Sequence, residues 1–176
     1  MCQFLYNKFL IAVVLNIEAI IKRITLQLIK HKIKSYIHNM TTASTEYLGE
    51  LRTSCSHNSS GTVIHTDAPL DNKGKGSAFS PTDLFVTSYA ACMTTIIGIY
   101  CQEHHISIKN CSAQINKVMY SNPRRVGEIH IELDLRGNNW DDKTLKKVVR
   151  AGETCPVAFS INPEIKTKIT YLTDSK

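Results

Sequence analysis

The chain has 176 residues, of which 43% are hydrophobic, and it carries a formal net charge of +6. This length and apolar content suffice for one hydrophobic core. The charge is uneven, because residues 1–39 hold six Lys or Arg and a single Glu, whereas the remainder is close to neutral. A nearly neutral body lacks the basic surface that phosphate backbones require, so nucleic-acid binding is excluded.

Six cysteines are scattered along the chain, at positions 2, 55, 92, 101, 111 and 155. They are too few and too irregular for a disulfide framework, so we predict a cytoplasmic protein with reduced thiols. Most of these thiols are expected to be buried as small apolar side chains. Four residues have a spacing similar to that of zinc ligands: Cys101, His104, His105 and Cys111. Their segment is expected to pass directly from a helix into a strand, so the four side chains are not expected to converge on one metal ion. We expect no metal and no cofactor.

Residues 1–39 are rich in Ile, Leu and Lys and contain no Gly or Pro. Their longest uncharged apolar run is too short to span a bilayer, and no small-residue cleavage site follows it. Three interpretations remain: a poor secretory signal, a basic amphipathic helix on a membrane or partner, and an upstream extension from a mis-assigned start codon. We favour a loosely attached helical extension without stable membrane insertion, followed by a domain over residues 40–176.

The domain is expected to begin with a hairpin. Residues 46–54 and 62–66 are rich in β-branched and aromatic residues, and the intervening SHNSSG is typical of a turn. The Gly-containing residues 67–79 then predict a flexible loop.

The organising stretch of the domain is residues 80–105. Ser80 is a predicted N-cap, Pro81 occupies the first helical position, and Asp83 places an acid in the first turn. Apolar residues follow on every side of the helical wheel, which predicts a helix buried all round at the centre of the protein.

Cys92 offers the strong nucleophile in the middle third of this helix. Ser88, Tyr89 and Thr95 lie three or four residues away and share its face. A thiol with neighbouring hydroxyls in an apolar helix is a candidate reactive site, although packing in the core is an equally ordinary role for Tyr89.

The remaining pattern predicts strands and one further helix. In residues 128–136, Ile129, Ile131, Leu133 and Leu135 alternate with polar residues, as in a half-buried antiparallel strand. His130 and Glu132 on its other face are expected to be solvated. The other predicted elements are a strand at 112–120, a turn at 122–127, an amphipathic helix at 139–152 and a closing strand at 165–172. Together they give one α+β domain.

Cys155 stands directly before Pro156, in TCPVAFS. A residue before proline is disfavoured in helical geometry, so Cys155 is a predicted N-cap with Pro156 at the first helical position. The positive end of that helix is expected to favour its thiolate.

The pattern SPTDLFVTSYAACM, followed by NPRRVGEIHIEL and TCPVAFS, resembles the OsmC/Ohr family of osmotically inducible and organic hydroperoxide resistance proteins. The resemblance covers about Tyr47 to Leu172, and the TDAP, GKG and SP elements resemble its less studied branch. It implies an intertwined homodimer of antiparallel sheets wrapped around buried central helices, with active sites at the subunit interface.

The resemblance also implies thiol peroxidase chemistry. Cys92 matches the cysteine that attacks an organic hydroperoxide and becomes a sulfenic acid, and Cys155 matches the resolving cysteine that forms a disulfide with it. An external dithiol, lipoyl-type or thioredoxin-like, would reduce that disulfide.

The chain departs from the family at the partners that activate the attacking thiol. Thr82 stands at the glutamate position and His57 at the arginine position. Asp83 is a substitute acid, and the candidate cations are Arg52, His57, Arg124 and Arg125. The alternative function is therefore a redox-responsive or small apolar ligand-binding protein with little turnover.

Overall fold

The computed structural model of the protein describes residues 20, 22–30, 32 and 41–174, in two compact units that divide between His65 and Thr66. Residues 20, 22–30 and 32 are helical and exposed. The rest of the predicted extension, and Met40 at the predicted domain start, lie outside the described residues.

The first unit contains strands β1 (Ala43–Gly49) and β2 (Arg52–His57), and β3 (Val63–Asp67) completes the three-stranded sheet β1-β2-β3. The prediction of one strand over residues 46–54 was wrong, because the chain reverses at Glu50 and Leu51. Both residues have positive φ, 50° and 63°, as the two central residues of a tight type I′ hairpin turn do. The usual Asn-Gly signal of this turn is absent from the sequence.

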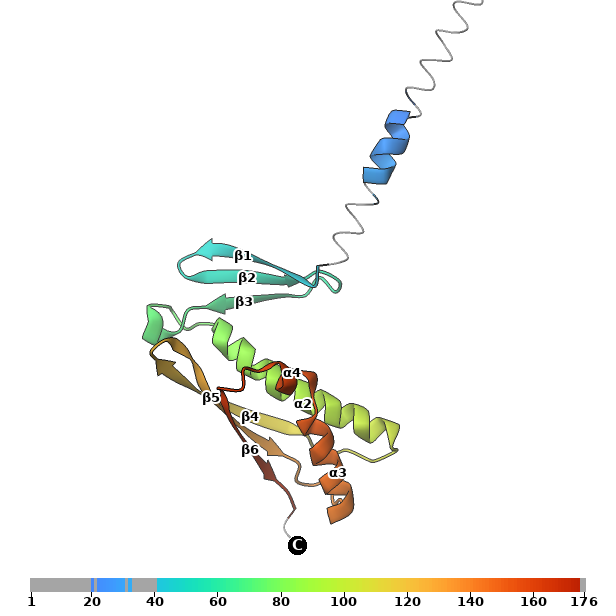
Figure 1. The fold of residues 1–176 in the computed structure, drawn as a ribbon, viewed down its shortest axis with the longest axis vertical. Coiled ribbons are helices and arrows are strands. Elements are labelled where there is room, and N and C mark those ends of the chain that lie inside the picture. The colour runs from blue at the N-terminus through green and yellow to red at the C-terminus, as the bar shows by residue number, and fades with distance from the viewer. Residues whose placement is uncertain (1–19, 21, 31, 33–40, 175–176) are drawn as a thin grey trace, which may run out of the picture. The chain divides into compact units, whose positions relative to one another are not determined.

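The second unit contains a three-stranded sheet in the order β4-β5-β6, formed by β4 (Ser112–Ser121), β5 (Arg124–Asp134) and β6 (Lys166–Leu172) (Figure 1). The β4–β5 pair is antiparallel, as expected, and the hairpin is tighter than predicted, since Ser121 already pairs with Arg124. The β5–β6 pair is parallel, so this sheet is mixed.

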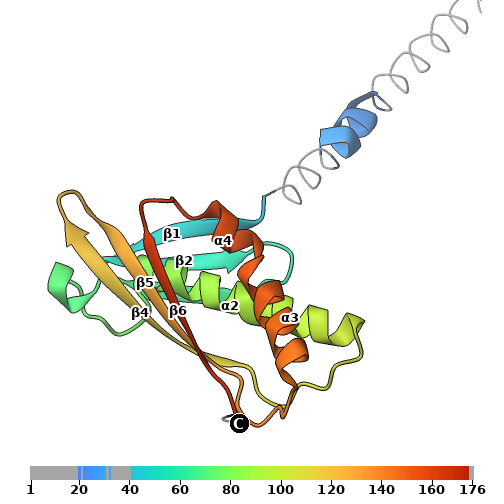
Figure 2. The same ribbon diagram turned by 60° about the horizontal axis from the view of Figure 1, so that its bottom comes forward.

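Three helices lie on one face of this sheet (Figures 1 and 2). They are α2 (Pro81–Glu103), α3 (Asp142–Glu153) and the short α4 (Pro156–Ser160), and α2 contacts both other helices as well as β4 and β5. A 3-10 turn at Leu70–Asn72 interrupts the predicted loop before α2. Strands, helices and their order confirm the α+β class.

The core of this unit forms where β5 faces the helices. Ile129, Ile131 and Leu133 are at most 2% exposed, and the alternation predicted for this strand is confirmed. They pack against α2 residues such as Met93 and Ile97, both fully buried. This core fixes α2, and therefore its cysteine, relative to the strands.

Helix α2 is not buried all round in the single chain, contrary to the sequence prediction. Its buried residues form one side: Val86, Tyr89, Ala90, Met93, Ile97 and Cys101. The other side leaves Phe85 40% and Ile99 45% exposed, with the small residues Ser88, Ala91 and Thr95 between them. The helix looked fully buried from sequence because its second side is also apolar or small, and the described part of the chain leaves that side exposed.

By length and composition, α2 is also the one helix in the described part of the chain that meets the requirement for crossing a membrane. Core helices meet the same requirement, and α2 packs through its buried side against the sheet and α3.

Candidate active site: a pair of thiols

The structure brings the thiols of Cys92 and Cys155 into contact. Cys92 lies in the middle of α2 and packs against the buried cluster that contains Cys155, which directly precedes α4; the two thiols are close enough for Cys92 to raise the pKa of Cys155. Both are free cysteines; Cys155 is fully buried, whereas Cys92 is partly exposed. The structure therefore places the two cysteines singled out from sequence next to each other.

Local sequence positions Cys155. It has extended backbone angles (φ −67°, ψ 144°), and Pro156 begins α4, which confirms the predicted N-cap. Its backbone N–H donates to the carbonyl of Gly152 at 3.3 Å, and its carbonyl accepts from the N–H of Ala158 at 3.0 Å. The residue is thereby held between the end of α3 and the start of α4.

The environment of Cys155 disfavours its thiolate. Burial raises the pKa of this thiol, and the hydrogen bond and charge of Cys92 raise it further. The backbone N–H groups of Ala158 and Val157 lower the pKa but do not compensate. The helix end therefore favours the thiolate as predicted, but burial outweighs the few N–H groups of a one-turn helix and the net pKa is raised.

Of the three hydroxyls predicted near Cys92, two bind their own helix. Ser88 donates to the carbonyl of Phe85 at 2.6 Å, and Thr95 donates to that of Ala91 at 2.8 Å. Tyr89, only 4% exposed, belongs to the same buried cluster as Cys155, and Cys92 packs against this cluster. Tyr89 is therefore the hydroxyl most closely associated with the thiols.

A lysine that sequence reasoning missed fixes the start of α2. The ammonium group of Lys117 donates to Ser80 Oγ at 3.0 Å, to Thr82 Oγ1 at 2.8 Å and to the carboxylate of Asp83. Burial would raise the pKa of Asp83, but the hydrogen bonds from Lys117 and Ser80 outweigh it and lower the pKa. Lys117 follows Ala113 and Ile115 on the core-facing side of β4, and that inward position was its signal.

Asp83 also completes a capping box with Ser80: the Asp83 N–H donates to Ser80 Oγ at 3.1 Å, and the Ser80 N–H donates to Asp83 at 2.7 Å. The predicted N-cap is confirmed, and the acid considered as a partner for the attacking thiol instead serves the helix end.

The cations proposed from sequence have other partners. Arg124 donates to Asp71 at 2.9 Å, and Arg125 pairs with Glu164 at 3.4 Å. His57, in the first unit, lies 2.7 Å from Ser60 Oγ. Arg52 begins β2 in that same unit.

Two further thiols lie where α2 meets β4. Cys101 is fully buried, and burial raises its pKa. Burial, with a smaller contribution from Cys101, raises the pKa of Cys111 to about 11. His104 stacks on Tyr100 in the same segment. Among the described residues, no three His, Cys, Asp or Glu side chains are placed to hold a metal ion.

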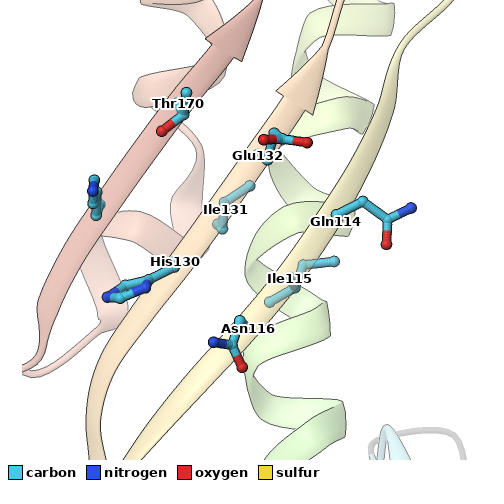
Figure 3. A pocket seen from close by; sticks show the side chains of 8 residues that line it. Gln114, Ile115, Asn116, His130, Ile131, Glu132 and Thr170 are labelled. Carbon is cyan, nitrogen blue, oxygen red and sulfur yellow. The ribbon is translucent and has the colours of Figure 1, made fainter.

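Two cavities of the second unit lie away from these thiols. One, of about 290 Å³, is lined on the sheet face opposite α2 mostly by polar residues of three strands (Figure 3), including Asn116, His130 and Lys168. His130 there lies 2.9 Å from Glu128, so this histidine is paired rather than simply solvated. A second, of similar volume, adjoins Trp140. Neither is lined by Cys92 or Cys155.

Solved structures share this fold. A protein from Psychrobacter arcticus, described as an osmotic stress induced and detoxification response protein, is 50% identical over 74% of this chain and 95% of its own, with a TM-score of 0.71. An organic hydroperoxide resistance protein OsmC from Legionella pneumophila is 20% identical over 74% of this chain and 94% of its own, with a TM-score of 0.58.

A further organic hydroperoxide resistance protein, from Vibrio cholerae with captopril in one active site, is 18% identical, covers 74% of this chain and 90% of its own, and has a TM-score of 0.58. No curated protein sequence matches the chain. The model of the OsmC-like protein family matches residues 74–170, which is more than half of the chain and includes both thiols of the site. With this match, the 50% identity and the shared fold, the chain belongs to the OsmC-like protein family.

Proposed function

We propose that the protein is a thiol-dependent peroxidase that reduces organic hydroperoxides. The Cys92 thiolate attacks the terminal peroxide oxygen, so that an S–O bond forms, the O–O bond breaks, and the leaving alkoxide takes up a proton to become an alcohol. Cys155 then attacks the Cys92 sulfenic acid, which forms the disulfide and releases water.

The observation that carries this proposal is the proximity of the two thiols: Cys92 packs against the buried cluster of Cys155 and raises its pKa. A disulfide requires sulfurs about 2.05 Å apart and close Cβ atoms. Two side chains that already lie side by side need only local adjustment to reach that geometry, whereas separated cysteines would need a backbone rearrangement.

Exposure supports the two roles in this proposal. Cys92 is partly exposed and Cys155 is fully buried. A peroxide from solution reaches the exposed sulfur first, so Cys92 is the attacking thiol and Cys155 the resolving one. An external dithiol, lipoyl-type or thioredoxin-like, then restores the reduced pair by attack at the accessible Cys92 sulfur.

The exposed side of α2 supports a homodimer. The side of α2 that carries Phe85 and Ile99 is apolar or small-residued and uncovered in the single chain. Contiguous exposed apolar surface of this kind is typical of subunit interfaces. A second copy on this side would enclose the region beside Cys92 and provide apolar walls for an alkyl or aryl hydroperoxide.

Two names among the structural neighbours support an organic substrate, because those proteins are described as organic hydroperoxide resistance proteins. At 20% and 18% identity, these two proteins support only the shared fold. The proposed chemistry rests on the thiol pair of this chain.

A stoichiometric titration tests the function. Reduced protein is mixed with cumene hydroperoxide, and the thiols lost and the cumyl alcohol formed are counted. We expect two thiols lost and one alcohol formed per chain, no reaction in Cys92→Ser, and a trapped sulfenic acid in Cys155→Ser. Cys55→Ser, which alters a thiol on β2, is the matched control and should behave as the wild type. Unchanged thiols at millimolar peroxide would refute the proposal.

A further inference from the structure

The helical segment that precedes β1 is exposed and carries both apolar and basic side chains. This basic segment comprises residues 20, 22–30 and 32, all exposed (blue in Figure 1). Its large aliphatic side chains are between 48% and 61% exposed: Ile20, Ile24, Leu26, Leu28 and Ile29. Its cations are Lys22, Arg23, Lys30 and Lys32, and these residues include no Asp or Glu. The described part of the chain therefore leaves an apolar and cationic helix open to solvent.

The two kinds of side chain favour different sides of this helix. Ile20, Ile24 and Leu28 recur every four residues, so they share one side. Lys22 and Lys30 share another, which begins two residues further along and therefore lies about 200° around the helix axis. Leu26 lies between these two lysines, whose alkyl stems can cover it. An apolar side opposite a Lys-rich side is typical of a helix that lies in a membrane interface.

An anionic lipid surface matches both sides of the segment at once. Anionic headgroups attract the cations, and the acyl chains below them accept the aliphatic side chains. A nucleic acid would match the cations but would leave the exposed Ile and Leu side chains in water. An apolar groove on another protein would match those side chains but would give the cations no counterpart. Charge complementarity and apolar area together therefore favour lipid as the partner.

The segment is too short and too highly charged to cross a bilayer. The span from residue 20 to residue 32 rises roughly 20 Å as a helix, whereas the hydrocarbon core of a bilayer is about 30 Å thick. Lys22 and Arg23 near one end, with Lys30 and Lys32 near the other, also keep both ends in the headgroup region. The helix therefore fits along the membrane surface.

We propose that the basic segment binds the surface of membranes that contain anionic phospholipid. Ile20, Ile24 and Leu28 insert below the headgroups, while the cations pair with lipid phosphates. This proposal specifies the second of the three interpretations of residues 1–39, and it does not rest on the proposed peroxidase function. Attachment through one short helix is reversible and is weakened by salt.

Vesicle co-sedimentation of the full-length protein tests the proposal. The protein is mixed with vesicles of phosphatidylcholine alone, or with about 30% phosphatidylglycerol, at about 0.1 M salt. Each cation near an anionic surface contributes about fivefold to the affinity. We expect affinity for the anionic vesicles to exceed that for the neutral vesicles at least about tenfold, and to fall when the salt is raised to about 0.5 M.

A charge variant tests the basic side of the helix. Lys22→Gln/Lys30→Gln should weaken binding to the anionic vesicles at least about tenfold. Lys146→Gln/Lys147→Gln removes the same charge from exposed positions of α3 and should change binding by less than about twofold. An equal loss in both variants would show that binding reflects only the net charge of the chain, and would overturn the proposal.

An apolar variant tests the other side without changing the charge. Ile24→Ser/Leu28→Ser should weaken binding to the anionic vesicles at least about tenfold, because two aliphatic side chains no longer enter the bilayer. Leu70→Ser, at a side chain that is 77% exposed in the second unit, should bind like the wild type. Because the altered side chains are exposed, thermal unfolding and the loss of thiols to cumene hydroperoxide should be unchanged in all of these variants.

Two further results would overturn the proposal. The first is a wild-type protein that fails to sediment with the anionic vesicles at low salt. The second is tighter binding to a single-stranded oligouridylate than to the vesicles, unaffected by Ile24→Ser/Leu28→Ser, which would identify the segment as a nucleic-acid contact. The peroxide titration is a separate measurement, so failure of the membrane proposal and failure of the proposed function are told apart.

Discussion

Cys92 lies beside Cys155, although one residue stands in the middle of a long helix and the other precedes a one-turn helix. Their environments differ. Cys155 is fully buried with a raised pKa, whereas Cys92 reaches the surface of the chain. Because of this difference, a reagent in solution can reach Cys92, whereas Cys155 can react only with a neighbouring group such as Cys92.

Alkylation rates should reflect this asymmetry. With iodoacetamide at about pH 7.5, peptide mapping is expected to show that Cys92 is modified well before the fully buried Cys155 and Cys101, because thiolate content and access both limit the reaction. Cys111, whose pKa is about 11, should also react slowly. In urea the differences should disappear. Modification of Cys155 in the folded protein as fast as that of Cys92 would contradict the burial described here.

Replacing Lys117 by Met should destabilise the protein. The side chain of this lysine is 18% exposed and donates three hydrogen bonds at the start of α2. Hydrogen bonds to charged groups are worth about 1.5–3 kcal/mol when well buried. Because Asp83 is 39% exposed and partly screened, we expect a loss of about 1–2 kcal/mol in urea unfolding. Lys146→Met, on the exposed side of α3, should change the free energy of unfolding by less than about 0.5 kcal/mol.

The effect of Lys117→Met should depend on pH. The folded-state pKa of Asp83 lies below its ordinary value of 3.8, so its ionised form stabilises the fold above about pH 4. That stability is lost as the pH falls through the folded-state pKa. The difference in unfolding free energy between wild type and Lys117→Met should therefore shrink as the pH is lowered from about 5 to 3. A difference that grows towards acid pH would show that the Lys117–Asp83 pair is not its origin.

Gly127→Ala should disturb the ring of Tyr120. A Cβ at Gly127 would lie 2.3 Å from Tyr120 Cδ1, so the ring must move. Movement would break the hydrogen bond of 3.0 Å from the Tyr120 hydroxyl to Glu128 and the contact of Arg125 with the ring. Overpacking of this kind costs about 1–3 kcal/mol. Urea unfolding should show this loss in the wild-type background and little of it in Tyr120→Ala, where the space is open.

Local sequence rules predicted the parts of the fold that local interactions determine. Ser80, Pro81 and Asp83 form the predicted helix start, and Cys155 with Pro156 forms the second. The alternation around Ile131 correctly identified the buried side of β5. These features depend on residues close in sequence, so spacing alone sufficed to find them.

Other features depend on contacts that a single local pattern does not contain. Glu50 and Leu51, the central residues of the first hairpin turn, have positive φ although neither is glycine or asparagine. Lys117 binds residues at the start of α2, which is distant in sequence, and the sequence around Lys117 does not indicate these partners. The net effect on the Cys155 thiol required knowing its burial as well as its helix position.

Disulfide mapping after a single oxidation tests the central claim most directly. Reduced protein is treated with one equivalent of cumene hydroperoxide, acid-quenched and digested without reduction, and the linked peptides are sequenced by mass spectrometry. The account predicts one dominant cross-link, between the peptide that contains Cys92 and the one that contains Cys155. A dominant link through Cys101 or Cys111, or alcohol production without any link to Cys155, would contradict it.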